Sequence, residues 1–330
     1  MTTTLLLPSI VLLIGLALLV WSSDIFVDGA ASVSNHLAIS PLIIGVVVLG
    51  FGTSMPEIIV STLAALDNSP GLAIGNAVGS NIANIGMVLG VAALISPIVI
   101  KSSILKRELP MLLAISLGAY ALVLDGNLGF ADGIVLVVAL ILAVIWMIKA
   151  NKELNPSDPL SSETIQAVDT LPELSMKKSI VFVVGGLLIL MVSAKMMVWG
   201  AVEIATAFEI SEAVIGLTII AIGTSLPELA AAISAARKNE ADLMIGNIIG
   251  SNMFNILAVL AVPALLSPSI LDSDMLIIDM PVMLGFTVLM LLFALPRNGI
   301  AVINKSKGLL LTIGFVAYLI VLFLRSTHVV

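Results

Sequence analysis

The sequence has no cysteine and is poor in charged, aromatic and histidine residues. Its 330 residues include two histidines, 5% aromatic residues and 11% charged residues, whereas 60% are hydrophobic. The lack of cysteine excludes disulfide bonds and thiolate metal sites. Soluble domains carry about 25% charged residues, so the low charge and a mean hydropathy of +1.21 predict an all-α polytopic membrane protein. Nothing in the sequence indicates a nucleic-acid partner, an obligate protein partner, a cofactor or an enzyme.

Long apolar runs indicate how often the chain crosses the membrane. A helix needs about 20 mostly apolar residues to span a bilayer. The sequence contains ten such runs, the fifth of them short: Leu5–Ala31, Leu37–Leu66, Leu72–Ile95, Leu109–Leu124, Ile134–Ile148, Ile180–Ala205, Ala213–Ala236, Leu243–Leu266, Met275–Leu295 and Leu309–Leu324. We therefore expect ten transmembrane helices.

The charges between these runs alternate from one connection to the next. One set of connections holds 12 of the 14 basic residues: Lys101, Lys106, Arg107, Lys149, Lys152, Lys177, Lys178, Arg237, Lys238, Arg297, Lys305 and Lys307. The other set holds only acids: Asp67, Asp125, Asp132, Glu209, Glu212, Asp272 and Asp274. Because basic loops stay in the cytoplasm, we expect a cell inner membrane protein whose central linker is cytoplasmic and whose termini are periplasmic or extracellular.

The chain contains one unit twice. Residues 40–97 align without a gap with residues 211–268, and nearly half of the aligned positions are identical. Each half holds five predicted spans, and this odd number makes the halves enter the membrane from opposite sides. We therefore predict two inverted five-helix repeats, residues 1–150 and 178–330, joined by a cytoplasmic linker at 151–177.

Each half contains a carboxylate beside a proline inside an apolar segment. GTSMPE at Gly52–Glu57 returns as GTSLPE at Gly223–Glu228, so that 171 residues separate the two glutamates. Proline cannot donate a backbone hydrogen bond, so it bends the helix and frees carbonyl oxygens. Ionisable residues inside a membrane are costly and are usually functional. The pair predicts a cation site near the membrane midplane, between the two repeats.

A second duplicated motif supplies further oxygen atoms. The third run contains GNAVGSNIAN at Gly75–Asn84, and the eighth contains GNIIGSNMFN at Gly246–Asn255. Residues four apart share a helix face, so we expect the serine and asparagine of each copy to line the site: Ser80, Asn84, Ser251 and Asn255. For the glycines we expect close helix packing: Gly75, Gly79, Gly246 and Gly250. Asn76 and Asn247 fit either support of a ligand or a hydrogen bond between helices.

This set of groups suits a hard cation. Calcium takes six to eight oxygen ligands from carboxylates, carbonyls and amides. Two glutamates neutralise one Ca²⁺, or a few Na⁺ ions can share them, and either load relieves the cost of burying the two anions. This equivalence gives a physical basis for the exchange of Na⁺ against Ca²⁺.

The duplicated motifs resemble the α-repeats of the sodium/calcium exchanger family, within the cation/calcium antiporter superfamily, and the resemblance covers nearly the whole chain. It implies alternating access, with Na⁺ influx coupled to Ca²⁺ efflux. By motif position, Glu57 and Glu228 would bind both ions, and Thr53 and Thr224 would give backbone carbonyls. The remaining ligands it implies are Ser54, Ser225, Ser80, Ser251 and the carbonyls of Gly50 and Ala221 for flanking Na⁺ sites, with Asn84 and Asn255 at the centre.

Two positions separate branches of this superfamily. Potassium-dependent exchangers tend to carry Asp at the position of Asn255, which disfavours potassium dependence. Calcium/proton exchangers carry Glu where this chain has Gly79 and Gly250, which disfavours proton coupling. The alternatives that stay open are a Ca²⁺/H⁺ or other divalent cation/H⁺ antiporter, a passive cation channel and an intramembrane protease that uses two carboxylates to activate water.

Charged residues in the first and sixth runs are not duplicated. Asp24 and Asp28 correspond to Lys195 and Trp199 in the second half. For the two aspartates we expect solvation at the membrane interface or a salt bridge, and for Lys195 a side chain that reaches toward the outer surface or acts in gating. Because these two runs lack the duplicated motifs, we predict that they slide against the motif-bearing core.

Overall fold

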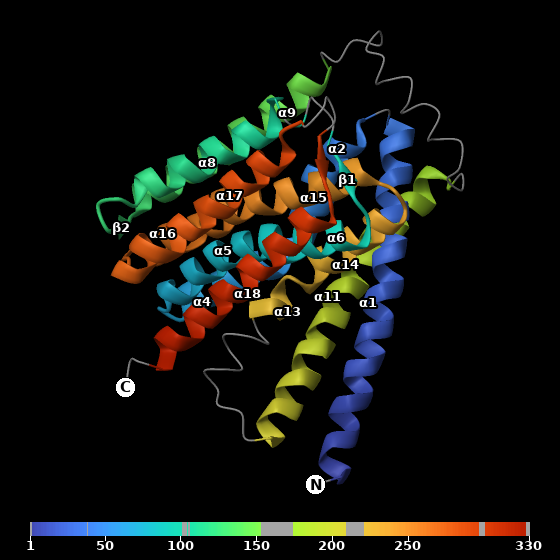
Figure 1. The fold of residues 1–330 in the computed structure, drawn as a ribbon, viewed down its shortest axis with the longest axis horizontal. Coiled ribbons are helices and arrows are strands. Elements are labelled where there is room, and N and C mark those ends of the chain that lie inside the picture. The colour runs from blue at the N-terminus through green and yellow to red at the C-terminus, as the bar shows by residue number, and fades with distance from the viewer. Residues whose placement is uncertain are drawn as a thin grey trace.

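The computed structural model describes residues 2–37, 39–100, 104, 106–152, 174–208, 221–296 and 301–327, and helices dominate it (Figure 1). The first half comprises α1 (Thr2–Leu37), α2 (Pro41–Ile44), η1 (Gly45–Gly50), α3 (Phe51–Thr53), α4 (Met55–Leu66), α5 (Pro70–Ala83), η2 (Asn84–Leu89), α6 (Gly90–Ile95), β1 (Ile98–Val99), α8 (Glu108–Leu122), β2 (Asn127–Leu128) and α9 (Phe130–Lys152). The second comprises α11 (Met176–Ala207), α13 (Ala221–Thr224), α14 (Leu226–Arg237), α15 (Ala241–Phe254), η5 (Asn255–Val259), α16 (Ala261–Leu266), β3 (Ser269–Ile270), η6 (Met275–Asp279), α17 (Met280–Ala294), β4 (Val302–Ile303) and α18 (Lys305–Thr327).

Several of these helices are long and apolar enough to cross a membrane. In the described part of the chain there are seven, and the bent pair Pro41–Thr53 with Met55–Leu66 makes an eighth. The helix Glu108–Leu122 is apolar but shorter. Nine of the ten predicted runs coincide with helices within the described ranges, whereas the seventh is described only from Ala221 onward. The predicted linker at 151–177 lies outside the described residues except at its ends.

The sequence duplication is repeated in the local structure. Helices α4, α5 and α6 have the same bounds as α14, α15 and α16 when 171 is added to each residue number. The turns after α4 and α14 contain Asn68 and Asn239, and both have left-handed backbones with φ of 55° and 59°. Asparagine tolerates this conformation better than most residues. Corresponding residues thus end corresponding helices.

Two helical segments form the centre of the molecule. In α5–η2–α6 and α15–η5–α16, 78% and 83% of the most apolar stretch is buried, against 17–22% in α1, α9, α11 and α18. The outer helices expose large apolar side chains such as Leu142 and Val181, as expected where lipid takes the place of water. These two segments therefore lie inside the molecule, whereas α1, α9, α11 and α18 expose apolar side chains.

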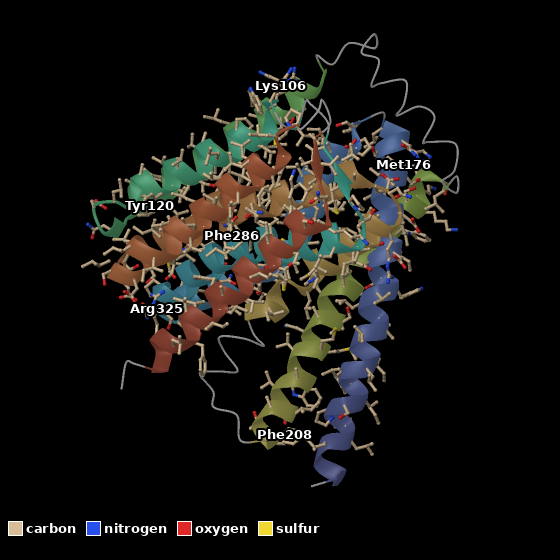
Figure 2. All side chains as sticks on the ribbon, viewed as in Figure 1. Lys106, Tyr120, Met176, Phe208, Phe286 and Arg325 are labelled. Carbon is tan, nitrogen blue, oxygen red and sulfur yellow. The ribbon has the colours of Figure 1, made fainter. Side chains whose placement is uncertain are left out.

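Contacts between the halves are regular as well. Strand β1, which follows α6, pairs antiparallel with β4, which precedes α18. Strand β3, which follows α16, pairs in the same way with β2, which precedes α9. At one end of α8 the Tyr120 hydroxyl donates a hydrogen bond to the carbonyl of Leu276 at 3.1 Å, and Figure 2 shows this tyrosine beside the β2 end of the helix. Each half thus contributes a strand to both small sheets.

Candidate functional site

The helix that carries each glutamate is broken one turn before it. Ser54 has φ −82° and ψ 2° between α3 and α4, and Ser225 has φ −90° and ψ 8° between α13 and α14. The segments on either side of Ser54 meet at 41°. Pro56 and Pro227 follow each break at the first helical turn, where the missing N–H is tolerated. The sequence prediction of a proline-associated bend is confirmed at Ser54.

The two carboxylates lie inside the protein. Glu57 is fully buried and Glu228 is 1% exposed. None of their four carboxylate oxygens has a hydrogen-bond partner, and the two groups are close enough to repel each other electrostatically. Both stand in the first turn of a helix, where the helix dipole favours a negative charge. The structure therefore brings Glu57 and Glu228 to one buried site, where no positive charge from the described part of the chain compensates the two carboxylates.

Two asparagine side chains are also buried without hydrogen-bond partners. Asn84 and Asn255 are buried, and no amide atom of either has a partner. Each begins a π-helical turn, η2 or η5, and such turns are frequent at functional sites. Helix α14 packs against η2, and α4 packs against η5. Each glutamate-bearing helix therefore contacts the asparagine-bearing turn of the other half.

Hydroxyl groups complete the set. Ser54 and Ser225 are fully buried, and their Oγ atoms also lack partners. The carbonyl of Gly50 accepts a hydrogen bond from Ser251 Oγ at 3.4 Å, and Ala221 is the first residue of α13. No three His, Asp or Glu side chains meet within the described ranges. Any cation held here would take its ligands beyond the two carboxylates from neutral oxygens.

Three polar residues form hydrogen bonds between the two halves. The Thr53 hydroxyl lies 3.1 Å from Asn247 Oδ1, to which it donates, and 3.2 Å from Ser251 Oγ. All three side chains are fully buried. The sequence left Asn247 open between ligand support and a bond between helices, and the structure gives it the bond. We call Thr53, Asn247 and Ser251 the closed triad.

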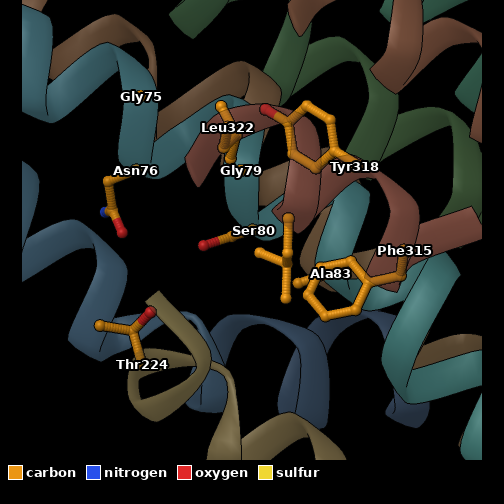
Figure 3. A pocket seen from close by; sticks show the side chains of 10 residues that line it. Gly75, Asn76, Gly79, Ser80, Ala83, Thr224, Phe315, Tyr318 and Leu322 are labelled. Atoms are coloured by element: carbon orange, nitrogen blue, oxygen red, sulfur yellow. The ribbon is translucent and has the colours of Figure 1, made fainter. Parts of the chain in front are cut away.

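The duplicated counterparts of these residues are arranged differently. Thr224, Asn76 and Ser80 line a cavity whose other wall is formed by α18, including Phe315, Tyr318 and Leu319. Figure 3 shows the polar ends of the three side chains turned toward a common space. Asn76 Nδ2 donates to the Glu57 carbonyl at 3.1 Å and to Ser61 Oγ at 3.0 Å. We call Thr224, Asn76 and Ser80 the cavity triad.

The four motif glycines show the same asymmetry. A Cβ added at Gly246 would lie 2.9 Å from the Cα of Gly45, and one at Gly250 would lie 2.7 Å from the Cα of Val46. At Gly75 and Gly79 no atom of the described chain lies within 4 Å of an added Cβ. The predicted close packing is therefore confirmed for the second copy of the motif, whereas the first copy faces the cavity.

Sequence reasoning missed one pair of buried amides. Asn81 and Asn252 donate their Nδ2 to the carbonyls of Ala77 and Ile248 at 2.9 and 2.7 Å. Their Oδ1 atoms are buried without a partner. Their identity at duplicated positions was the available signal, since both belong to the repeated GSN triplets.

Comparison with known proteins identifies the family of the chain. The family described as sodium/calcium exchanger protein matches residues 7–149 and 178–324. The inner membrane protein YrbG of Escherichia coli strain K12 is 41% identical over 97% of this chain and 98% of its own. The sodium/calcium exchanger MaX1 of Methanosarcina acetivorans is 30% identical over 95% of this chain and 98% of its own.

A solved structure has the same fold. The sodium-calcium exchanger NCX_Mj, soaked with Na⁺ and Ca²⁺, superimposes with a TM-score of 0.81 and 34% sequence identity. The match covers 94% of this chain and 97% of that one. The polytopic helical fold expected from the sequence is thereby confirmed, and the chain belongs to the sodium/calcium exchanger family.

Proposed function

We propose that the protein is a secondary antiporter that exchanges Na⁺ for Ca²⁺ by alternating access. The observation that carries the proposal is the pair of buried glutamates, whose four carboxylate oxygens have no partner within the protein. A buried charge without compensation is strongly destabilising, so the site calls for a cation. The family and its structural neighbours are transporters rather than enzymes, which argues against the intramembrane protease.

Most of the proposed ligands are buried like the two glutamates. Glu57 and Glu228 bind Ca²⁺ or Na⁺ in turn, and the amide oxygens of Asn84 and Asn255 complete the centre. Around them we place the backbone carbonyls of Thr53 and Thr224 and four hydroxyl groups: Ser54, Ser225, Ser80 and Ser251. The carbonyls of Gly50 and Ala221 serve the flanking Na⁺ sites. Support comes from the unpartnered oxygens and from the oxygen preference of both ions.

For the whole chain we propose ten transmembrane helices in two inverted repeats, residues 1–150 and 178–330. The matching bounds of α4–α6 and α14–α16 support the repeat. We place the basic connections and the linker at 151–177 in the cytoplasm and both termini outside. A relative described as an inner membrane protein supports the same membrane for this one.

Flux measurements on the purified protein test the function. Proteoliposomes loaded with Na⁺ and diluted into Na⁺-free buffer should take up Ca²⁺, and replacing internal Na⁺ by choline should stop the uptake. Glu57→Gln and Glu228→Gln should each abolish it, because one carboxylate cannot neutralise Ca²⁺. Uptake that ignores Na⁺ and follows a pH gradient would instead identify a Ca²⁺/H⁺ antiporter, and flux without any counter-ion would identify a channel.

A further inference from the structure

Helices α1 and α11 form one tightly packed pair that stands beside the rest of the molecule (Figure 1). Duplicated glycines bring the two backbones together: Gly15 and Gly29 on α1 correspond to Gly186 and Gly200 on α11. An added Cβ at Gly29 would lie 2.8 Å from the nitrogen of Val183, and one at Gly186 would lie 2.9 Å from the nitrogen of Phe26. Ser32 and Ser179 share a hydrogen bond of 2.7 Å across the pair. The pair can therefore shift against the core only as a unit.

Charged residues join this pair to the core at one place. Lys238, at the C-terminal end of α14, makes an ion pair of 2.5 Å with Asp28 on α1 and donates to the carbonyl of Asp24 at 3.1 Å. Ser234 on α14 donates to the Asp24 carboxylate at 2.6 Å. The side chains of Lys238 and Asp28 are only 24% and 29% exposed. A salt bridge is thus present at Asp28 but not at Asp24, and it joins α1 to the helix that carries Glu228.

Asp28 of this ion pair corresponds to Trp199, so the pair itself is not duplicated, but two neighbouring positions carry charges of reversed sign in the other half. Asp24 on α1 corresponds to Lys195 on α11, and Lys238 after α14 corresponds to Asp67 after α4. Both residues are exposed, and no ion pair joins them among the residues that the structure describes. Helix α1 packs along α14, whereas α11 has no comparable contact with α4. The ion pair of Asp28 with Lys238 is formed, whereas Lys195 and Asp67, both in the described part of the chain, are not paired with each other.

The two polar triads differ from each other in the same way as the two charge pairs. Asn247 of the closed triad lies nine residues after Lys238, and Asn76 of the cavity triad lies nine residues after Asp67. The formed ion pair therefore lies at the end of α14, which packs against α15 with its closed triad, and Asp67 follows α4, which packs against α5 beside the cavity. Two independent features show the same one-sided state.

We propose that Asp28–Lys238 and Lys195–Asp67 are two alternating ion-pair latches between the α1–α11 pair and the core. The first holds the form seen here, in which the cavity beside Ser80 is open. When α1 and α11 shift, the first breaks and Lys195 meets Asp67 as the cavity closes. In this scheme α1 has an ion-pair partner only in the form seen here, and α11 has one only in the shifted form. This inference rests on the proposed alternating access, whose direct test is flux.

Thiol labelling tests the latches, because the natural chain has no cysteine. Leu319→Cys places a single thiol on the cavity wall, and its rate of reaction with a small impermeant reagent reports the open form in proteoliposomes. Adding Lys238→Ala should slow this labelling about two- to fivefold, because loss of a partly exposed ion pair shifts the equilibrium by that order. Adding Lys195→Ala as well should bring the rate back toward that of the parent.

A second pair of variants separates a latch from a general structural role. Exchanging the two charges, with Asp28→Lys and Lys238→Asp together, should restore the labelling rate of the parent. Cross-linking of Lys195→Cys with Asp67→Cys by a short bifunctional reagent should increase when Lys238→Ala is added. Labelling that does not respond to Lys238→Ala, or that Lys195→Ala slows further, would overturn the proposal.

Neither measurement needs Na⁺-driven transport. Opposed labelling shifts without Na⁺-dependent Ca²⁺ uptake would leave the latches in place and refute only the exchange. Exchange with unchanged labelling would refute only the latches.

Discussion

The four carboxylate oxygens of Glu57 and Glu228 have no hydrogen-bond partner although both glutamates are buried. Ordinary buried acids are paired or hydrogen-bonded, since an isolated one costs several kcal/mol. Both glutamates stand at a helix N-terminus, whose weak field favours a negative charge. We therefore infer that glutamate is needed here to bind a transported cation and not for folding.

Thermal unfolding should reveal this cost directly. Without Ca²⁺ or Na⁺, Glu57→Gln and Glu228→Gln should each raise the melting temperature in detergent, because each removes one of two repelling buried charges. Saturating Ca²⁺ should stabilise the parent by about 2.7 kcal/mol at one hundred times its Kd and should leave both variants nearly unchanged. Differential scanning fluorimetry with a Ca²⁺ titration measures both effects, and Asp125→Asn at the exposed loop is a matched control. Equal stabilisation of parent and variants by Ca²⁺ would contradict this assignment.

Asn255 leads to a second expectation at this scale. A neutral amide at this position supplies an oxygen ligand but no third negative charge. The two glutamates balance the charge of the bound Ca²⁺ or Na⁺, and no further carboxylate among the described residues is present there to balance a K⁺ ion. Replacing choline by K⁺ on both sides of the membrane should leave the rate of Na⁺-dependent Ca²⁺ uptake unchanged. A K⁺ requirement in proteoliposomes would show that the amide does not set this property.

The helix crossings show how the two copies of one motif differ. Gly250 meets the backbone of η1, whereas Gly79 faces the cavity. The duplicated sequence is the same at both points, so the sequence alone indicated packing at both. If the protein alternates between two states as proposed, we expect the packed and the open copy to exchange.

Alanine at these two glycines should therefore have unequal effects. Gly250→Ala forces a methyl group against the Val46 backbone and should lower the free energy of unfolding by about 1–3 kcal/mol. Gly79→Ala should fold normally, since no described atom lies within 4 Å of the new methyl group. Thermal melting of both variants in the same detergent makes each the control for the other. Similar melting temperatures would mean that the two crossings interchange freely.

Much of the element layout could be predicted from sequence, and its details could not. Apolar runs identify helices because the bilayer sets their length, and Pro56 marked the break at Ser54. The π turns at Asn84 and Asn255 were not predicted, because a regular helix and a π turn have the same apolar pattern. The sequence left two roles open for Asn247, ligand support and a hydrogen bond between helices. The hydrogen bond with Thr53 could be assigned only once the structure placed α15 against η1.

At the scale of the whole molecule, the alternation of charge predicts how the chain crosses the membrane. Because the natural chain has no cysteine, single thiols report position without background. Asp125→Cys and Asp272→Cys should react with an impermeant maleimide on intact cells. Lys178→Cys should react only after the cells are permeabilised, since we place basic connections inside. Labelling of all three on intact cells would contradict the orientation.

The burial of Glu57 and Glu228 also bears on how tightly the two fluxes are linked. A carrier that returned without its cargo would have to move two uncompensated negative charges through a dry interior, which is a high barrier. A loaded carrier meets no such barrier, because either cargo cancels the charge. We therefore expect leak through the empty protein to be slow, so that the energy stored in the sodium gradient is not lost in idle cycles.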